Sequence, residues 1–167
     1  MSTDDVDALI EKMAAELSRL ITSQQLDNPL MVGIHTGGVW VAKRLHKLLA
    51  LQEPLATLDI SFYRDDFTRI GINPQVKPSV LPRHLDDRNI ILVDDVLYTG
   101  RTVRAALNEI FDYGRPARIL LAVLLDRGGR ELPLEANVTG KQLLLKQNEQ
   151  VKLTGPEPLR YEIQQVP

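Results

Sequence analysis

The sequence predicts an α/β domain with a mainly parallel central sheet flanked by helices, because short apolar runs alternate with segments of helical periodicity along its 167 residues. Residues 1–167 fit a single domain of ordinary size. In parallel sheets, ligands bind beyond the carboxyl ends of the strands. We therefore expect the functional residues to follow the predicted strands, which end near residues 34, 62, 93 and 125.

The first predicted element is an amphipathic helix. Ser2 or Thr3 is the expected N-cap, and the acidic residues beside them suit the positive end of a helix dipole. Asn28-Pro29 ends the region. The apolar residues that recur at three- and four-residue steps on one face are Val6, Leu9, Ile10, Met13, Leu17, Leu20 and Ile21.

A strand, a helix and a second strand follow. Residues 30–34 form a short apolar run that is typical of a buried strand, and residues 39–49 return to a helical period. Pro54 restarts the chain as an extended segment over residues 55–62, where apolar and polar residues alternate. This order is the start of a parallel sheet with a crossover helix.

The same pattern occurs again in the second half of the chain. Residues 89–93 are apolar and predict a strand, and residues 102–113 predict a helix that Gly114 is placed to end. Residues 118–125 predict another buried strand. The tail from Gly140 has only short apolar pieces and three prolines, so we interpret it as edge strands.

One long segment, residues 63–80, has no sustained period. It contains Gly71, Pro74 and Pro78 and many charged residues. A connection of this length inside a small domain is unusual and is often a lid or a binding loop. The sequence therefore predicts a lid or a binding loop between the second and third strands.

Composition excludes several classes of protein. Hydrophobic residues make up 44% and charged residues 25%, which is ordinary globular usage, and the net charge of −2 argues against a strongly basic nucleic-acid binder. The chain has no cysteine, so disulfides and thiolate chemistry are excluded. No apolar run reaches the length of a membrane helix, and the acidic start is not a signal peptide, so we expect a cytoplasmic protein with no membrane partner.

The strongest chemical signal is the strand-to-helix turn over residues 90–102. Asp94 and Asp95 follow four apolar residues, and carboxylates accept hydrogen bonds from the hydroxyls of a sugar. Gly100 then allows the main chain to approach an anion at the start of the next helix. This chemistry indicates a phosphosugar site, although a lone Asp and Gly would more often be a helix cap and a turn. The expected binding residues after the acids are Val96, Leu97, Tyr98, Thr99, Gly100, Arg101 and Thr102.

This run resembles the phosphoribosyl pyrophosphate (PRPP) motif of the type I phosphoribosyltransferases, and the variant Val-Leu-Tyr-Thr-Gly-Arg-Thr resembles the PyrR family in particular. PyrR proteins combine regulation of the pyrimidine operon with uracil phosphoribosyltransferase activity. The likeness covers about residues 30–141 and includes four further stretches in the same order, at residues 33–40, 59–66, 111–117 and 125–133. It implies the type I phosphoribosyltransferase fold and the transfer of phosphoribose from PRPP to uracil, which gives UMP and diphosphate.

The resemblance also implies roles for three other segments. Thr36, Gly37 and Gly38 match the pyrophosphate loop, although composition alone would favour a simple turn. Arg64, as a catalytic residue, and Lys77 lie in the segment that matches the family's flexible lid loop and are candidates for contacting the pyrophosphate. Magnesium is implied too, held mainly by the diphosphate of PRPP, and no protein metal ligand is expected. The nucleobase is expected at Asp126, Arg127 and Gly128, with the guanidinium flat against the uracil ring.

Three functions stay open at this point. The protein is a uracil phosphoribosyltransferase, a nucleotide-sensing regulator that binds a pyr mRNA leader or a protein partner with little catalysis, or a phosphoribosyltransferase for another base. Residues 101–130 hold six arginines against three acidic residues, a small basic surplus that more often marks an ordinary solvated face than an RNA site. Relatives form dimers and larger assemblies, so the resemblance implies a homo-oligomer. The three histidines are scattered and have no metal-ligand spacing.

Overall fold

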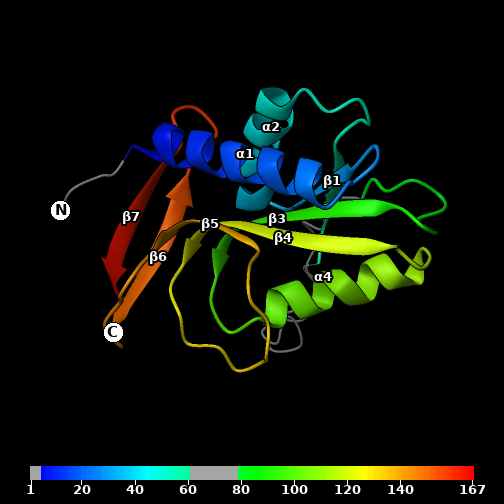
Figure 1. Cartoon of the computed structure of the whole chain (residues 1–167). Coiled ribbons are helices and arrows are strands. Elements are labelled where there is room, and N and C mark those ends of the chain that lie inside the picture. The colour runs from blue at the N-terminus through cyan, green and yellow to red at the C-terminus, as the bar shows by residue number, and fades with distance from the viewer. Residues whose placement is uncertain (1–4, 61–78) are drawn as a thin grey trace.

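A computed structural model describes residues 5–60 and 79–167. Its central feature is a five-stranded parallel sheet in the order β2-β1-β3-β4-β5 (Figure 1). No helix within the described ranges is long and apolar enough to cross a membrane. The helices are α1 (Val6–Ser23), α2 (Gly37–Leu49) and α4 (Arg101–Asp112). The strands are β1 (Leu30–Ile34), β2 (Ala56–Leu58), β3 (Asn89–Leu97), β4 (Arg118–Asp126), β5 (Val138–Gln142), β6 (Glu149–Thr154) and β7 (Arg160–Gln165).

Helices cover both faces of this sheet, as the alternation of apolar side chains requires. Figure 1 shows α1 and α2 on one face and α4 on the other. Ile91 and Val93 of β3 belong to the core beneath α1 and α2, whereas Ile90 and Leu92 belong to the core beneath α4. Successive residues of a strand point to opposite faces, so a buried parallel strand must be apolar at every position. The predicted α/β class with a mainly parallel sheet is confirmed.

The start of α1 differs from the predicted one. The N-cap is Asp5, whose Oδ1 accepts a hydrogen bond from the Asp7 N–H at 2.9 Å, and the helix begins at Val6. The expected caps, Ser2 and Thr3, lie outside the described residues. Asp7 in the first turn also pairs with Arg44 of α2, so the acidic start of the chain serves both the helix end and the contact between α1 and α2.

Asp5→Ala is expected to lower the free energy of unfolding by about 1 kcal/mol, because the helix then loses the side-chain acceptor for one of its free N–H groups. Chemical denaturation would measure this change. Asp5→Ser should retain most of the stability, because serine is an equally good cap. Equal stability of the alanine and serine variants would contradict the assignment of Asp5 as the cap.

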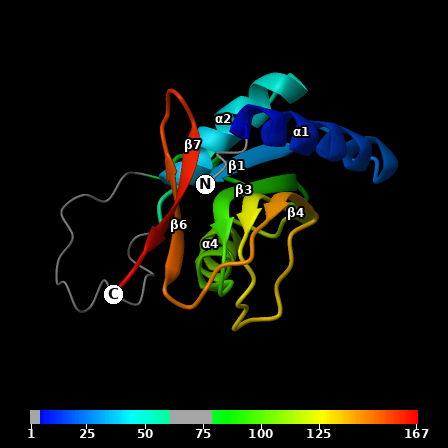
Figure 2. The ribbon, with the colours of Figure 1, turned by 90° about the vertical axis from the view of Figure 1, so that its left-hand side faces the viewer.

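The C-terminal part of the chain departs most from the prediction. β5 begins at Val138 and joins the parallel sheet next to β4, with Val123 paired to Thr139. The apolar residues 143–145 form no strand. β6 and β7 form a separate antiparallel hairpin and not edge strands of the main sheet, as the orange and red ribbons of Figure 2 show. The interpretation of this tail as edge strands is correct for β5 alone.

The hairpin lies against the core under α1 and α2. Leu153, Leu159 and Tyr161 are buried in the same cluster as the α1 and α2 side chains. Burial raises the pKa of Tyr161. An added Cβ at Gly155 would come within 3.1 Å of the Trp40 ring of α2. The hairpin is therefore an integral part of the domain, and it ends near the loops that follow β4.

Candidate active site

The two acidic residues lie inside β3 and not after its end. β3 continues to Leu97, and Asp94 is in register with Val123 of β4. Asp94 is only 5% exposed, and its Oδ1 accepts a hydrogen bond from the Asp95 N–H at 2.8 Å. Asp95 is half-buried, and its Oδ1 accepts from the Val96 N–H at 2.9 Å. The expected end of the strand at Val93 is wrong, because the ladder with β4 continues beyond the last apolar residue of the run.

The acids face the start of α2, where two glycines allow a close approach. Thr36 is the exposed N-cap of this helix, and Gly37 begins it. A Cβ added at Gly37 would come within 2.7 Å of the Asp95 Cγ, and one added at Gly38 would come within 3.0 Å of the Asp94 Cα. The structure thus brings Thr36, Gly37 and Gly38 together with both acids, with no room for a side chain between them.

The loop after β3 leads into the N-terminus of α4. Gly100 is the N-cap residue and has φ +95°, which a side chain would disfavour. The Thr99 Oγ1 accepts a hydrogen bond from the Arg101 N–H at 3.2 Å. The other N–H groups of the first turn have no partner within the helix, which makes a helix start of this kind an anion site. Tyr98 and Arg101 are exposed and Thr99 and Thr102 are half-buried, so the loop is open to solvent.

The loop after β4 packs directly on the loop after β3. The Arg127 N–H donates to the Leu97 carbonyl at 3.0 Å, and the Glu131 N–H donates to the Thr99 carbonyl at 2.9 Å. Arg130 fastens the two loops together, because its guanidinium donates to the Tyr98 carbonyl at 2.9 Å and forms an ion pair with Asp126 at 2.6 Å. Neither Arg130 nor Glu131 is among the predicted site residues. Both lie in the stretch at residues 125–133 that resembles the PyrR family, and this resemblance is the signal for them in the sequence.

Arg127 contacts two other segments of the chain. Its guanidinium carbon is 3.9 Å from the centre of the Tyr98 ring, an arrangement typical of a cation–π contact. Its NH2 group also donates to the Glu149 carbonyl of β6 at 3.2 Å. In the structure without a ligand, the Arg127 guanidinium thus lies against a neighbouring tyrosine, and its contact with uracil stays a prediction.

The pKa of the Asp126 carboxyl is lowered in the fold. Burial raises the pKa of its carboxyl, but the hydrogen bond from Arg130, the Gly128 N–H and the charge of Arg130 together outweigh burial and lower it. The Gly128 N–H donates to the Asp126 Oδ1 at 2.9 Å. The ionised form of Asp126 is therefore the one that holds the loop after β4.

The lowered pKa predicts how acid weakens this loop. The carboxylate contributes stability above the pKa of the unfolded chain, and this contribution disappears as the pH falls through the lower pKa of the fold. Asp126→Asn should therefore be less stable than the parent chain at about pH 7, and the difference should shrink toward about pH 3. Denaturation of both proteins across this range would measure it. A difference that is constant with pH would contradict the role of the charge.

Two predicted site residues, Arg64 and Lys77, lie outside the described residues, as does most of the expected lid. Among residues 5–60 and 79–167, no group of three or more His, Asp or Glu side chains could hold a metal ion. His46 instead makes a 2.7 Å hydrogen bond to the Glu53 carbonyl. The site that the structure describes therefore consists of the two acids, the starts of α2 and α4, and the loop after β4.

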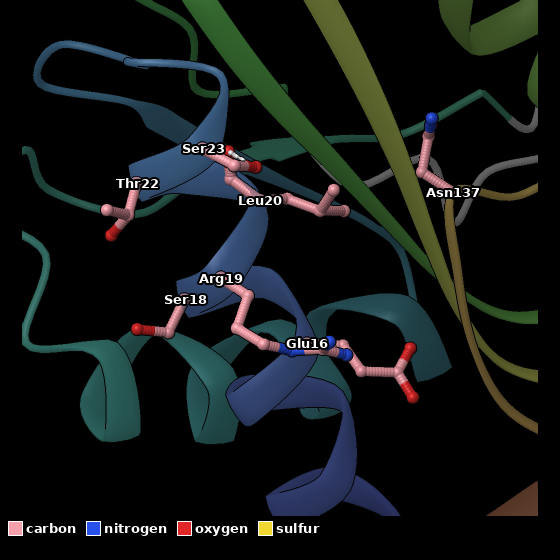
Figure 3. Close-up of a pocket in the computed structure, with 7 residues that line it drawn as sticks. All are labelled: Glu16, Ser18, Arg19, Leu20, Thr22, Ser23 and Asn137. Carbon is pink, nitrogen blue, oxygen red and sulfur yellow. Dashed lines mark hydrogen bonds between the residues drawn. The ribbon is translucent and has the colours of Figure 1, made fainter.

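Cavities occur both at this site and away from it. One cavity of about 480 Å³ is bounded by Asp126–Gly128 and by Gln142, among others, and so adjoins the loop after β4. A larger cavity of about 640 Å³ lies at the C-terminal half of α1, where Figure 3 shows Arg19, Glu16 and Asn137 around it. This larger cavity shares no residue with the acids or the glycine loops. The largest volume among these cavities and the predicted site therefore lie in different places.

Comparison with known proteins agrees with this geometry. Residues 2–157 match the phosphoribosyl transferase domain family. The chain is 60% identical over 164 residues to the bifunctional protein PyrR of Nitrosococcus oceani, covering 97% of this chain and 93% of the relative. It is 54% identical over 162 residues to the protein of the same name from Pseudomonas paraeruginosa, covering 97% and 95%. The chain belongs to the PyrR family of phosphoribosyltransferases.

Solved structures of other phosphoribosyltransferases share the fold. A hypoxanthine-guanine phosphoribosyltransferase from Bacillus anthracis superposes with a TM-score of 0.71 at 18% identity, covering 90% of this chain and 86% of that one. The hypoxanthine phosphoribosyltransferase of Trypanosoma cruzi gives 0.65 at 22% identity, covering 83% and 73%. At this identity the likeness establishes the fold alone. The expected type I phosphoribosyltransferase fold is confirmed, and the choice of base must come from the family.

Proposed function

We propose that this phosphoribosyltransferase transfers phosphoribose from PRPP to uracil, giving UMP and diphosphate. The observation that carries the proposal is the convergence of two helix N-termini and two carboxylates at one edge of the sheet. Asp94 and Asp95 would hold the ribose hydroxyls and offset the positive charge that develops on the ring. The start of α4 would hold the 5′-phosphate, and Thr36 with its two glycines the leaving diphosphate.

Membership of the PyrR family supports uracil over a purine or orotate. The structural relatives that act on hypoxanthine are only 18–22% identical, whereas the PyrR relatives are 54–60% identical. No side chain in the described part of this site is an evident general base. The C–O bond to diphosphate can break before the nucleobase attacks, and this step needs no general base. The proton that uracil loses from N1 would pass to the departing diphosphate or to water.

The residues present fit a magnesium ion that is bound mainly through the substrate. Mg²⁺ keeps several waters and is commonly held by one or two carboxylates together with phosphate oxygens. Asp94 and Asp95 are the carboxylates near the diphosphate loop that could take part. The metal, when bound, offsets charge on the leaving diphosphate.

The test is a direct assay. The pure protein, incubated with labelled uracil, PRPP and Mg²⁺, should form UMP, and omission of Mg²⁺ should abolish it. Hypoxanthine and orotate should give no nucleotide. Absence of UMP under every condition would refute the enzymatic proposal, and conversion of another base in place of uracil would refute the choice of base.

Regulation through a pyr mRNA leader is the second proposed activity, favoured by the word bifunctional in the relatives' name. The arginines of residues 101–130 support it weakly. Arg101 pairs with Glu131 and Arg130 with Asp126. Arg127 lies on Tyr98 and Arg118 donates to the Gln24 side chain, so at least four of the six arginines are engaged within the chain. A gel-shift assay should show tighter binding to a pyr leader than to random RNA of equal length; equal binding would refute regulation through RNA. Both activities would belong to a homo-oligomer in the cytoplasm.

A further inference from the structure

We propose that Tyr98 and Arg127 are positioning residues that couple the 5′-phosphate loop to the base loop. Occupation of the phosphate loop would then strengthen binding of the base, and loss of their contact would uncouple the two. This inference rests on the proposed function, because it assigns the phosphate to residues 98–102 and the base to the loop after β4.

Arg127 joins three segments that are far apart in the sequence. Its N–H donates to the Leu97 carbonyl, one residue before the phosphate loop. Its guanidinium covers the Tyr98 ring at 3.9 Å and donates to the Glu149 carbonyl of the C-terminal hairpin at 3.2 Å. The hairpin is itself anchored in the core under α1 and α2. The hydrogen bond to Glu149 therefore restrains the guanidinium that lies against the Tyr98 ring.

The base loop also touches the Tyr98 ring through its main chain. A Cβ added at Gly129 would lie 2.5 Å from the Tyr98 Cε1, and Gly129 has φ +76°. The ring is 47% exposed, so it is not held there by burial in a core. The ring contacts the Arg127 guanidinium and approaches the main chain at Gly129, and both of these residues belong to the base loop. The position of this ring and the shape of residues 127–129 are thus fixed together.

One donor of Arg127 is left without a partner in this arrangement. The Nε of Arg127 is buried and has no hydrogen-bond partner among the described residues. A buried donor without an acceptor costs about 1–3 kcal/mol. Unsatisfied groups of this kind call for a specific explanation, such as a functional role. Positioning of the two loops relative to each other is such a role.

The experiment compares the affinities of UMP and uridine, which differ only in the 5′-phosphate. The dissociation constant of uridine divided by that of UMP measures how far the phosphate strengthens binding. Calorimetric titration, with weak affinities obtained by competition against UMP, would be done on the parent chain and on Tyr98→Leu, Arg127→Met and Tyr98→Phe. Tyr113→Leu and Arg104→Met are matched controls, because both side chains are exposed on or beside α4 and both residues lie outside residues 98–102 and 127–129.

The ratio should fall by about fivefold or more in Tyr98→Leu and Arg127→Met, the lower end of usual coupling energies. Tyr98→Phe should keep it, because phenylalanine retains the ring face that attracts the cation. In the double variant with both Tyr98→Leu and Arg127→Met, the ratio should fall no further than in either single variant. Both controls should leave it unchanged.

Each other outcome contradicts the inference. An unchanged ratio in Tyr98→Leu, with UMP still bound by the parent chain, would overturn the coupling and leave the proposed function standing. Failure of the parent chain to bind UMP would overturn the proposed function and this inference with it. Circular dichroism would show whether Arg127→Met is folded; if it is not, the Tyr98→Leu and Tyr98→Phe pair decides alone.

Discussion

Replacing Asp94 and Asp95 together by asparagine is expected to lower kcat/KM for UMP formation by at least about 10²- to 10³-fold, the usual cost of removing a preorganised electrostatic group. Asparagine has the same shape and keeps an oxygen that can accept the 2.8 Å bond from the Asp95 N–H and the 2.9 Å bond from the Val96 N–H. The free energy of unfolding should therefore change by only about 1 kcal/mol. Steady-state kinetics and denaturation would measure the two effects.

A ligand that lacks the diol separates this role from a general loss of structure. UMP and its 2′,3′-dideoxy analogue should bind with clearly different affinities to the parent chain. They should bind almost equally to the double variant, because the groups that contact the hydroxyls are then altered. Asp112→Asn, at the exposed end of α4, is the matched control and should change neither quantity. Full activity of the double variant would refute the assignment of the acids.

Gly37→Ala is expected to lose activity, whereas Gly38→Ala is expected to lose stability. The Cβ that Gly37→Ala adds would come within 2.7 Å of the Asp95 Cγ, and a half-buried carboxylate can rotate away. This variant should fold and lose most of its activity. The Cβ that Gly38→Ala adds would lie 2.8 Å from the Val93 carbonyl oxygen and 3.0 Å from the Asp94 Cα, both of them backbone. Gly38→Ala should therefore lose about 1–3 kcal/mol of stability.

Thermal unfolding and kcat/KM of the two glycine variants test this contrast. Gly38→Ala should unfold at a lower temperature than Gly37→Ala, while Gly37→Ala should have an unfolding temperature near that of the parent chain. A Gly37→Ala enzyme with full activity would show that the gap between α2 and Asp95 is not part of the site. A Gly38→Ala protein as stable as the parent would show that the close approach to β3 can relax without cost.

The central strands and helices could be predicted because each is apolar with a clear period. The runs at residues 30–34, 89–93 and 118–125 are all buried strands, and the glycines and acids that follow them do meet at one edge. What periodicity could not show was the end of β3. Polar residues such as Asp94 remain in the ladder there because β4 continues beside them, and pairing of this kind is a tertiary effect.

The remaining features depend on contacts that no local pattern encodes. The Arg127 side chain meets Tyr98 and Glu149, residues 29 and 22 positions away, so its orientation follows from the packing of loops. The C-terminal hairpin, likewise, has short strands with few apolar residues, and its place under α2 depends on Trp40 and Leu159. Sequence patterns predicted which residues supply the chemistry of this site, whereas the contacts among them required the fold.

A crystal structure with bound UMP tests the central claim most directly. We expect the ribose hydroxyls within hydrogen-bond distance, about 2.6–3.2 Å, of the Asp94 and Asp95 carboxylates. The phosphate should lie against the N–H groups of residues 99–102 at the start of α4. UMP bound elsewhere, for example in the larger cavity beside α1, or bound here with its phosphate away from α4, would contradict the account.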